Sequence, residues 1–316
     1  MGAVAFIFPG QGSQTVGMGK DLKENFAEAK EIFKQADDAL KFELSSLCFE
    51  GPVAELNLTP NTQPAILTVS VAALRVLEEK IGIKPDYLAG HSLGEYTALI
   101  AAKAFDFSEG VKTVQKRGQY MQEAVPEGEG GMAAILGLER EVVEEVCRIA
   151  ANGEVLTPAN FNCPGQIVIS GHTNALKRAM ALAREKGARK VVPLPVSAPF
   201  HCELMLPAAK RLQEYLKGIS INPLIYPVVT NVEATENQEP NRVKELLIKQ
   251  LTYPVRWEDS VKAMVKRGVN TFIEIGPGKV LTGLVKRIER SVKVFHVEDT
   301  KTLNVLEKAW KEINRK

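Results

Sequence analysis

The chain has 316 residues, of which 45% are hydrophobic and 25% charged, and its 40 basic and 38 acidic residues leave a formal net charge of +2. This length predicts about two domains, or one large domain with an insertion. The positive and negative charges are interspersed, which argues against a nucleic-acid-binding protein. No stretch approaches the roughly 18 apolar residues of a membrane span, and no signal peptide opens the chain. We therefore expect a cytoplasmic protein that does not bind the membrane.

Apolar strands alternate with amphipathic helices along most of the chain. Strands are expected at residues 4–8, 87–89, 225–230, 271–275 and 292–297, and helices at residues 62–81, 95–103 and 107–125 and from about residue 303. Alternation of this kind indicates a parallel sheet with helices on both faces, whose ligand site forms at the carboxyl ends of the strands. We therefore predict an α/β fold.

The middle of the chain has a different order of strands and helices. Its pattern predicts strand 131–138, helix 140–151, strand 155–161, strand 166–170, helix 173–185 and strand 189–196. This β-α-β-β-α-β order is that of a ferredoxin-like unit, and the glycine-rich residues before it are typical of a hinge. We expect a subdomain of residues 127–196 inserted into a body of residues 1–126 and 197–316, with a ligand cleft between them.

The pentad Gly-His-Ser-Leu-Gly at residues 90–94 lies where an apolar strand runs into a helix. A serine on such a tight turn is held in a strained conformation with its hydroxyl exposed, and the flanking glycines avoid collisions with the strand and helix. The N–H of Leu93, at the positive end of the helix, would face an oxyanion on a carbonyl that Ser92 attacks. A flexible glycine-containing loop is the alternative, but the strand–helix context favours Ser92 as a nucleophile.

The loop Gln-Gly-Ser-Gln at residues 11–14, after the first strand, is a second candidate. Gly10 and Gly12 allow close backbone approach, so the N–H of Gln11 would supply the other half of an oxyanion hole. A glycine-rich structural turn explains the same pattern.

A serine hydroxyl needs a base to take its proton. Among the four histidines, His91 adjoins the nucleophile, and we expect it to have a supporting role. His201 follows the inserted segment where the chain re-enters the body, which predicts a base at the cleft; a helix-capping or packing role is the alternative. No carboxylate can be singled out to orient His201, and a backbone or amide carbonyl would serve.

Arg117 lies on the apolar stripe of the helix expected at residues 107–125. It follows Val114 by three residues and precedes Met121 by four, so it projects along the same face. A guanidinium in the core requires an anionic partner, because an unpaired buried charge is costly. That partner is either an internal Asp or Glu, or a substrate carboxylate held bidentately.

Five motifs together resemble those of malonyl-CoA:acyl-carrier-protein transacylases, over nearly the whole chain. They are Phe-Pro-Gly-Gln-Gly-Ser-Gln at 8–14, Gly-His-Ser-Leu-Gly-Glu at 90–95, Gln-Lys-Arg-Gly at 115–118, Asn160 with Asn162, and Phe200 with His201. The acyltransferase domains of polyketide synthases are also similar, but the length fits a stand-alone enzyme of type II fatty-acid synthesis.

The resemblance implies an α/β-hydrolase-like body with a ferredoxin-like insert, and a ping-pong transfer through a malonyl ester of Ser92. His201 is then the base, oriented by a main-chain carbonyl near Gln250. The implied role of Arg117 is to pair with the malonyl carboxylate, while Gln11 and Leu93 supply the oxyanion N–H groups. The other implied substrate-binding residues are Gln63, His91, Asn160, Asn162 and Phe200. Phe200 is of the type associated with malonyl preference, although the preceding Ala198-Pro199 departs from the polyketide pattern.

The resemblance also implies the partners. Malonyl-CoA and an acidic acyl carrier protein are the substrates, the protein is a monomer, and no metal or organic cofactor is required because coenzyme A arrives with the substrate. The candidates for the carrier-docking surface are Lys186, Arg189 and Lys190, for which an ordinary solvated face is the alternative. The four cysteines lack paired spacing, which predicts reduced, buried thiols and neither disulfides nor a zinc site.

Two other functions compete with malonyl transfer. A serine esterase or thioesterase of the α/β-hydrolase class would share the serine turn and the α/β body. However, an enzyme for neutral esters has no use for a buried cation such as Arg117. A catalytically silent module that only binds the carrier protein is the second rival, and the presence of both Ser92 and His201 argues against it.

Overall fold

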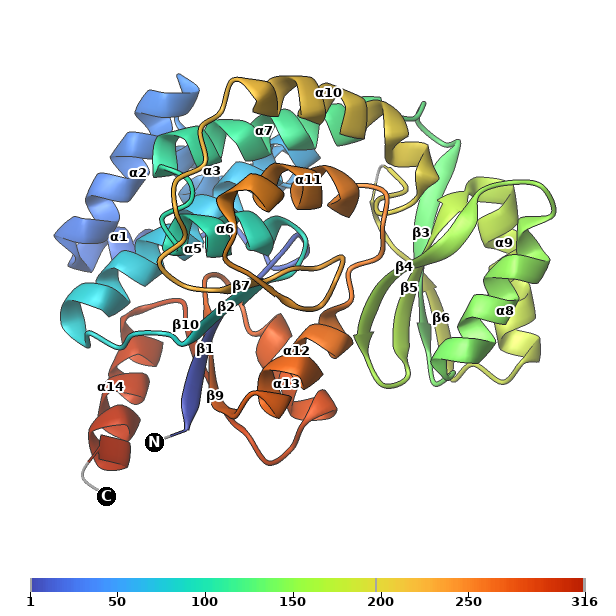
Figure 1. The fold of residues 1–316 in the computed structure, drawn as a ribbon. Helices are drawn as coiled ribbons and strands as arrows, with labels where there is room; N and C mark the ends of the chain where they lie inside the picture. The colour runs from blue at the N-terminus through green and yellow to red at the C-terminus, as the bar shows by residue number, and fades with distance from the viewer. Residues whose placement is uncertain (1, 197, 315–316) are drawn as a thin grey trace.

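The structure is a computed structural model that describes residues 2–196 and 198–314 and contains two β-sheets (Figure 1). The larger sheet has the order β10-β9-β1-β2-β7-β8, and all its neighbours are parallel except β7 and β8. Its strands are β1 (Ala3–Phe8), β2 (Tyr87–Gly90), β7 (Val228–Val229), β8 (Glu236–Asn237), β9 (Val269–Ile275) and β10 (Lys293–Val297). The parallel sheet and the separate antiparallel sheet confirm the α/β fold class.

Helices cover both faces of the large sheet. In β1, Val4, Phe6 and Phe8 belong to one buried apolar cluster, whereas Ala5 and Ile7 belong to another. The first cluster includes residues of α2 (Ala27–Leu40), α5 (Thr59–Lys80), α6 (Leu93–Ala101), α7 (Phe107–Glu123), α10 (Leu206–Lys217), α11 (Pro240–Gln250) and α14 (Thr300–Asn314). The second includes α12 (Trp257–Lys266) and α13 (Val280–Ile288). Alternate strand residues therefore point to opposite cores, as the period of two in a strand requires.

Three short helices complete the body: α1 (Lys20–Asn25), α3 (Leu44–Glu50) and α4 (Val53–Leu56). No helix of the described residues is long and apolar enough to cross a membrane. All four cysteines are unpaired and buried, as the sequence predicts.

The smaller sheet is antiparallel, with the order β4-β5-β3-β6. Its elements are β3 (Gly130–Leu136), α8 (Arg140–Ala151), β4 (Leu156–Cys163), β5 (Gln166–His172), α9 (Thr173–Glu185) and β6 (Lys190–Pro193), in the expected β-α-β-β-α-β sequence. Helices α8 and α9 cover the face of this sheet turned away from the body (Figure 1). Residue 197, where we place the second subdomain boundary, lies outside the described residues, as do residues 315 and 316.

Backbone hydrogen bonds join the small sheet to the body. The N–H of Phe161 in β4 donates to the carbonyl of Val255 at 2.9 Å, and the N–H of Val255 donates to that of Ala159 at 2.8 Å. Val255 directly precedes the segment that leads into α12. Strand β4 is thereby held against the body, which positions its side chains at the boundary between the two sheets.

Several expected elements differ in extent, including the strand expected at residues 189–196, of which only Lys190–Pro193 is a strand. The strand expected at residues 225–230 contains only Val228–Val229, because Pro227 has no N–H to donate to the sheet. Helix α5 begins at Thr59 instead of residue 62, with a proline in its first turn, where proline is favoured. Strand β3 begins at Gly130, one residue earlier than expected, and a side chain at Gly130 would collide with Pro199.

Candidate active site

Ser92 lies on the turn between β2 and α6, at the carboxyl end of the strand. Its φ of 52° is in the left-handed region, which is strained for a residue with a side chain. A Cβ on Gly90 would lie 1.9 Å from the backbone carbon of Gly94, and one on Gly94 would lie 2.1 Å from the carbonyl oxygen of Phe8. Both glycines are therefore required by close backbone approach, as the sequence predicts.

Asn231 stabilises this strained turn through two hydrogen bonds to its backbone. Its Oδ1 accepts the N–H of Ser92 at 2.6 Å, and its Nδ2 donates to the carbonyl of Gly90 at 2.6 Å. Asn231 follows β7, which pairs with β2, so sheet formation brings it to the serine. No local sequence pattern points to Asn231, and our reading of the sequence missed it.

The side chains of Ser92 and His201 meet at hydrogen-bonding distance. The Oγ of Ser92 lies 2.8 Å from Nε2 of His201, and Nδ1 of His201 lies 2.7 Å from the main-chain oxygen of Gln250. A carbonyl can only accept, so Nδ1 carries the proton and Nε2 is free to accept from the serine hydroxyl. Gln250 is the last residue of α11, where helix carbonyls lack an intrahelical partner. Local sequence pattern singled out no acceptor for His201, but the resemblance implied a main-chain carbonyl near Gln250, and the structure places that helix-terminal carbonyl at Nδ1.

His201 is neutral in the resting site. Burial, reinforced by the charge of Arg117, lowers the pKa of His201 to about 3. A neutral imidazole can take the proton of Ser92. The negative end of the α11 dipole faces Nδ1 and favours the imidazolium that then forms.

Arg117 is buried beside the serine, with 1% of its surface exposed. Its Nη1 donates to Oε1 of Gln63 at 2.8 Å, and its Nη2 donates to Oε1 of Gln250 at 2.9 Å and to Oγ of Ser92 at 3.0 Å. All of these acceptors are uncharged. Within the described part of the chain Arg117 forms no direct ion pair, so the internal Asp or Glu that the sequence left open as its partner does not contact it.

Glu95 is the carboxylate that acts electrostatically on Arg117, and it too is buried. Its Oε2 accepts the N–H of Asn231 at 3.0 Å and Nε2 of Gln250 at 2.7 Å, while Nε2 of Gln250 also lies 3.1 Å from the carbonyl of Ser92. Burial raises the pKa of Glu95 to about 7. Gln250 thus connects the serine, the arginine and the glutamate. Our reading of the sequence missed the role of Glu95, although it directly follows the serine pentad.

The two expected oxyanion donors flank the serine. Leu93 is the first residue of α6, so its N–H has no intrahelical acceptor. A Cβ on Gly10 would lie 2.3 Å from the carbonyl oxygen of His91, so this glycine lets the loop of Gln11 lie directly against the serine turn. Gln11 and Leu93 line the same cavity as Ser92.

That inner cavity has a volume of about 100 Å³. It is polar at Ser92, His201 and Arg117, and apolar at Met121, Met132 and Phe200. Because one water molecule occupies about 30 Å³ of liquid, the cavity accommodates only a small acyl group.

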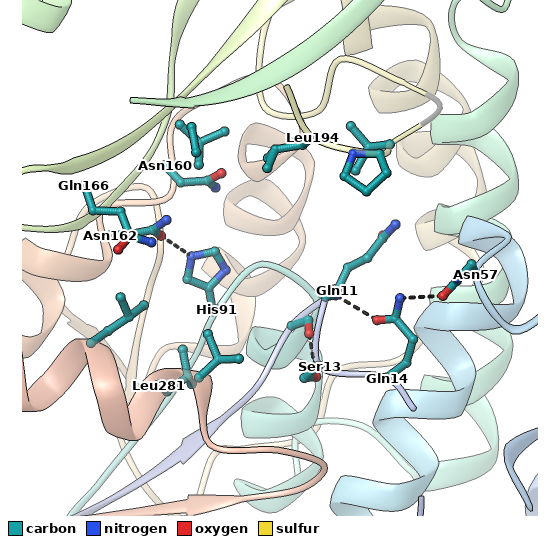
Figure 2. A pocket seen from close by; sticks show the side chains of 18 residues that line it. Gln11, Ser13, Gln14, Asn57, His91, Asn160, Asn162, Gln166, Leu194 and Leu281 are labelled. Carbon is teal, nitrogen blue, oxygen red and sulfur yellow. Dashed lines mark hydrogen bonds between the residues drawn. The ribbon is translucent and has the colours of Figure 1, made fainter. Parts of the chain in front are cut away.

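A larger outer pocket of about 440 Å³ adjoins the inner cavity, with which it shares Gln11, His91 and Asn160. Figure 2 shows His91 and Asn162 turned toward each other, with Nε2 of His91 2.8 Å from Oδ1 of Asn162. Burial lowers the pKa of His91, so its neutral ring donates to Asn162. Apolar side chains of the small sheet (Ala134 and Val168), of the segment after β6 (Leu194) and of α13 (Leu281) complete the wall. Asn160 and Asn162 therefore line the approach to the serine.

The remaining expected residues lie outside these cavities. Lys186, at the end of α9, lies 3.5 Å from Oε1 of Glu145, and both it and the neighbouring Arg189 are exposed. Lys190 is an exposed residue of β6 that pairs with Leu136. Among the described residues, no group of three or more His, Cys, Asp or Glu side chains converges as a set of metal ligands.

Comparison with known proteins identifies the family of this chain. A model of the acyl transferase domain matches residues 5–314. The malonyl CoA-acyl carrier protein transacylase of Bacillus subtilis is 51% identical over 315 residues, which cover 99% of each chain. The crystal structure of an acyl carrier protein S-malonyltransferase from Vibrio cholerae is 48% identical, with a TM-score of 0.94 over 96% of this chain and 99% of the other.

A further solved structure shows a malonyl-transacylase in complex with its type II polyketide acyl-carrier protein. It is 44% identical to this chain, with a TM-score of 0.95 over 97% of this chain and 99% of the other. These similarities confirm the resemblance that the motifs carry. The chain therefore belongs to the acyl transferase domain family.

Proposed function

We propose that this chain transfers a malonyl group from malonyl-CoA to the phosphopantetheine thiol of an acyl carrier protein, through a malonyl ester of Ser92. The observation that carries the proposal is the guanidinium of Arg117, buried 3.0 Å from Oγ of Ser92 and hydrogen-bonded only to uncharged groups. A bound carboxylate would supply the missing anion, held bidentately. The relatives described above, which are named for malonyl transfer, support the same activity.

In the first half-reaction, Nε2 of His201 takes the hydroxyl proton of Ser92 while Oγ attacks the thioester carbonyl carbon. The N–H groups of Gln11 and Leu93 hold the resulting oxyanion. The carbon–sulfur bond then breaks, and coenzyme A leaves as a thiol with the proton from His201.

The second half-reaction reverses these steps with another thiol. His201 takes the proton of the carrier thiol, whose sulfur attacks the ester carbonyl, and Ser92 leaves with that proton. The outer pocket, with Asn160 and Asn162 on its wall, is where the pantetheine arm of either substrate lies. Arg117, Gln63 and Phe200 enclose the malonyl group and leave water poorly placed to attack.

We further propose that the protein acts in the cytoplasm as a monomer, with no metal or organic cofactor beyond the coenzyme A of its substrate. The body of residues 1–126 and 197–316 contributes the reacting groups, and the subdomain of residues 127–196 contributes Asn160 and Asn162. The carrier is an acidic protein, and Lys186, Arg189 and Lys190 are the docking candidates that the sequence suggests.

Intact-mass measurement tests the proposal. The protein is mixed with malonyl-CoA, methylmalonyl-CoA or acetyl-CoA, and then with holo-acyl carrier protein. We expect a malonyl adduct that is absent in Ser92→Ala and that passes to the carrier. Release of free malonate without carrier labelling would indicate a hydrolase, and full transfer by Ser92→Ala would refute the serine ester.

A further inference from the structure

Helix α13 presents an exposed basic surface beside the entrance to the outer pocket. Val280, Lys286 and Arg287 are exposed residues of α13, and the exposed Lys279 and Arg290 flank its two ends. The seven-residue spacing of Val280 and Arg287 puts these two on one side of the helix. We call these five residues the α13 face. The nine residues of α13 span about 13 Å, enough to contact one helix of a partner.

The α13 face is continuous with the pocket. Val280, Leu281 and Leu284 line the outer pocket, and Val280 is at the same time 52% exposed. Arg287 extends from α13 to the small sheet, where its Nη1 donates to Oε1 of Gln166, another lining residue, at 2.5 Å. A partner on this face would therefore lie at the entrance through which a thiol arm reaches Ser92.

Basic residues outnumber acidic ones on this surface, because residues 279–290 contain four Lys or Arg and one carboxylate, Glu289. None of its four basic residues forms an ion pair within residues 2–196 and 198–314. The nearest acidic residues in sequence are bound elsewhere: Glu274 accepts the N–H groups of Leu281 and Thr282 beneath the helix, and Glu289 accepts from Ser291. A cationic surface with one exposed apolar side chain fits an acidic partner that also offers an apolar contact.

The surface of Lys186, Arg189 and Lys190, which the sequence suggests, is a weaker candidate for docking the carrier protein. Lys186 already lies 3.5 Å from a glutamate, and α9, which it follows, packs on the face of the small sheet turned away from the body (Figure 1). Neither Lys186 nor Arg189 lines the outer pocket.

We infer that the α13 face is where the acidic carrier protein docks while its thiol arm enters the outer pocket. This inference rests on the proposed function. It is specific to the second half-reaction, because coenzyme A brings no protein surface to the entrance.

The test measures the two half-reactions separately for Lys286→Glu/Arg290→Glu, whose positions are outside the pocket lining. The first measurement is the rate of malonyl-Ser92 formation from malonyl-CoA. The second is the rate of malonyl transfer from Ser92 to holo-acyl carrier protein and, separately, to free pantetheine. The control is Lys30→Glu/Lys34→Glu, which reverses two exposed lysines four residues apart on α2. Lys186→Glu/Arg189→Glu tests the rival surface, and thermal melting checks that every variant is folded.

We expect the α13 variant to lower kcat/KM for the carrier by at least about tenfold at low ionic strength, with a smaller loss at high salt, because charges at an interface rim act chiefly on association. Transfer to pantetheine, which is uncharged, and acylation at saturating malonyl-CoA should stay within about twofold, since neither depends on the association of a docked protein. Unchanged carrier transfer, an equal loss in acylation, or the same loss in the Lys186 variant would overturn the inference. Malonyl-Ser92 formation by the unaltered protein tests the proposed function independently.

Discussion

Replacing Arg117 with alanine should abolish the preference for malonyl over acetyl groups. Removing one member of a buried, hydrogen-bonded charge pair costs about 3–5 kcal/mol, or roughly 150- to 4,000-fold in kcat/KM for malonyl-CoA. Acetyl-CoA has no carboxylate, so its reaction should be affected only by loss of the 3.0 Å contact between Nη2 of Arg117 and Oγ of Ser92. That contact contributes about 1 kcal/mol, which corresponds to a roughly fivefold fall in kcat/KM for acetyl-CoA. The malonyl-to-acetyl ratio should therefore fall at least about 30-fold.

The assay is the rate of acyl-Ser92 formation with each thioester at concentrations below KM. Arg117→Lys is the matched variant: it keeps the charge but not the bidentate geometry, and should retain part of the selectivity. Alanine also leaves Oε1 of Gln63 and Oε1 of Gln250 without the donor, so thermal melting must show that the variant is folded. Equal losses for malonyl-CoA and acetyl-CoA would refute the assignment of Arg117 as the carboxylate-binding residue.

Three further perturbations probe the site and its support. Gly94→Ala should lower the free energy of unfolding, measured in urea, by at least about 2 kcal/mol, since its Cβ would lie 2.1 Å from the carbonyl oxygen of Phe8. The control is Gly283→Ala, whose Cβ would meet nothing within 4 Å and which should be neutral or stabilising. Equal urea midpoints for the two variants would contradict this prediction. Burial raises the pKa of Glu95 from 4.5 to about 7, so the folded protein keeps a proton that the unfolded chain releases in this range. The free energy of unfolding should therefore fall as pH rises through that window, by about 3 kcal/mol at most from Glu95, and Glu95→Gln should lack this contribution; an identical pH dependence in the variant would disprove it. Asn231→Ala should lower kcat for acylation by roughly 10- to 100-fold with little change in KM, because the N–H of Ser92 and the carbonyl of Gly90 lose their partner; an unaltered kcat would rule out a positioning role.

The local sequence was enough to predict the serine turn and the order of the small sheet. Gly90 and Gly94 are needed because backbone atoms approach closer than a side chain allows, and that requirement arises within a few residues of Ser92. The periods of strands and helices likewise predicted β3 to β6 and their two helices. The strand at residues 225–230 was overestimated, because its apolar character was weighed without the missing N–H of Pro227.

By itself, the sequence determined the candidates for the chemistry: a serine on a strained turn, a histidine after the insert and an arginine on an apolar stripe. Only the tertiary structure decided what surrounds them. Gln250 and Asn231 reach the serine from positions 158 and 139 residues away, because the end of α11 and the end of β7 converge there. Local periodicity reports which face of an element is buried, but the partner across a core depends on how distant elements pack. For that reason the contacts of Asn231 with the serine turn, the uncharged hydrogen-bond partners of Arg117 and the basic face of α13 beside the pocket emerged only from the fold.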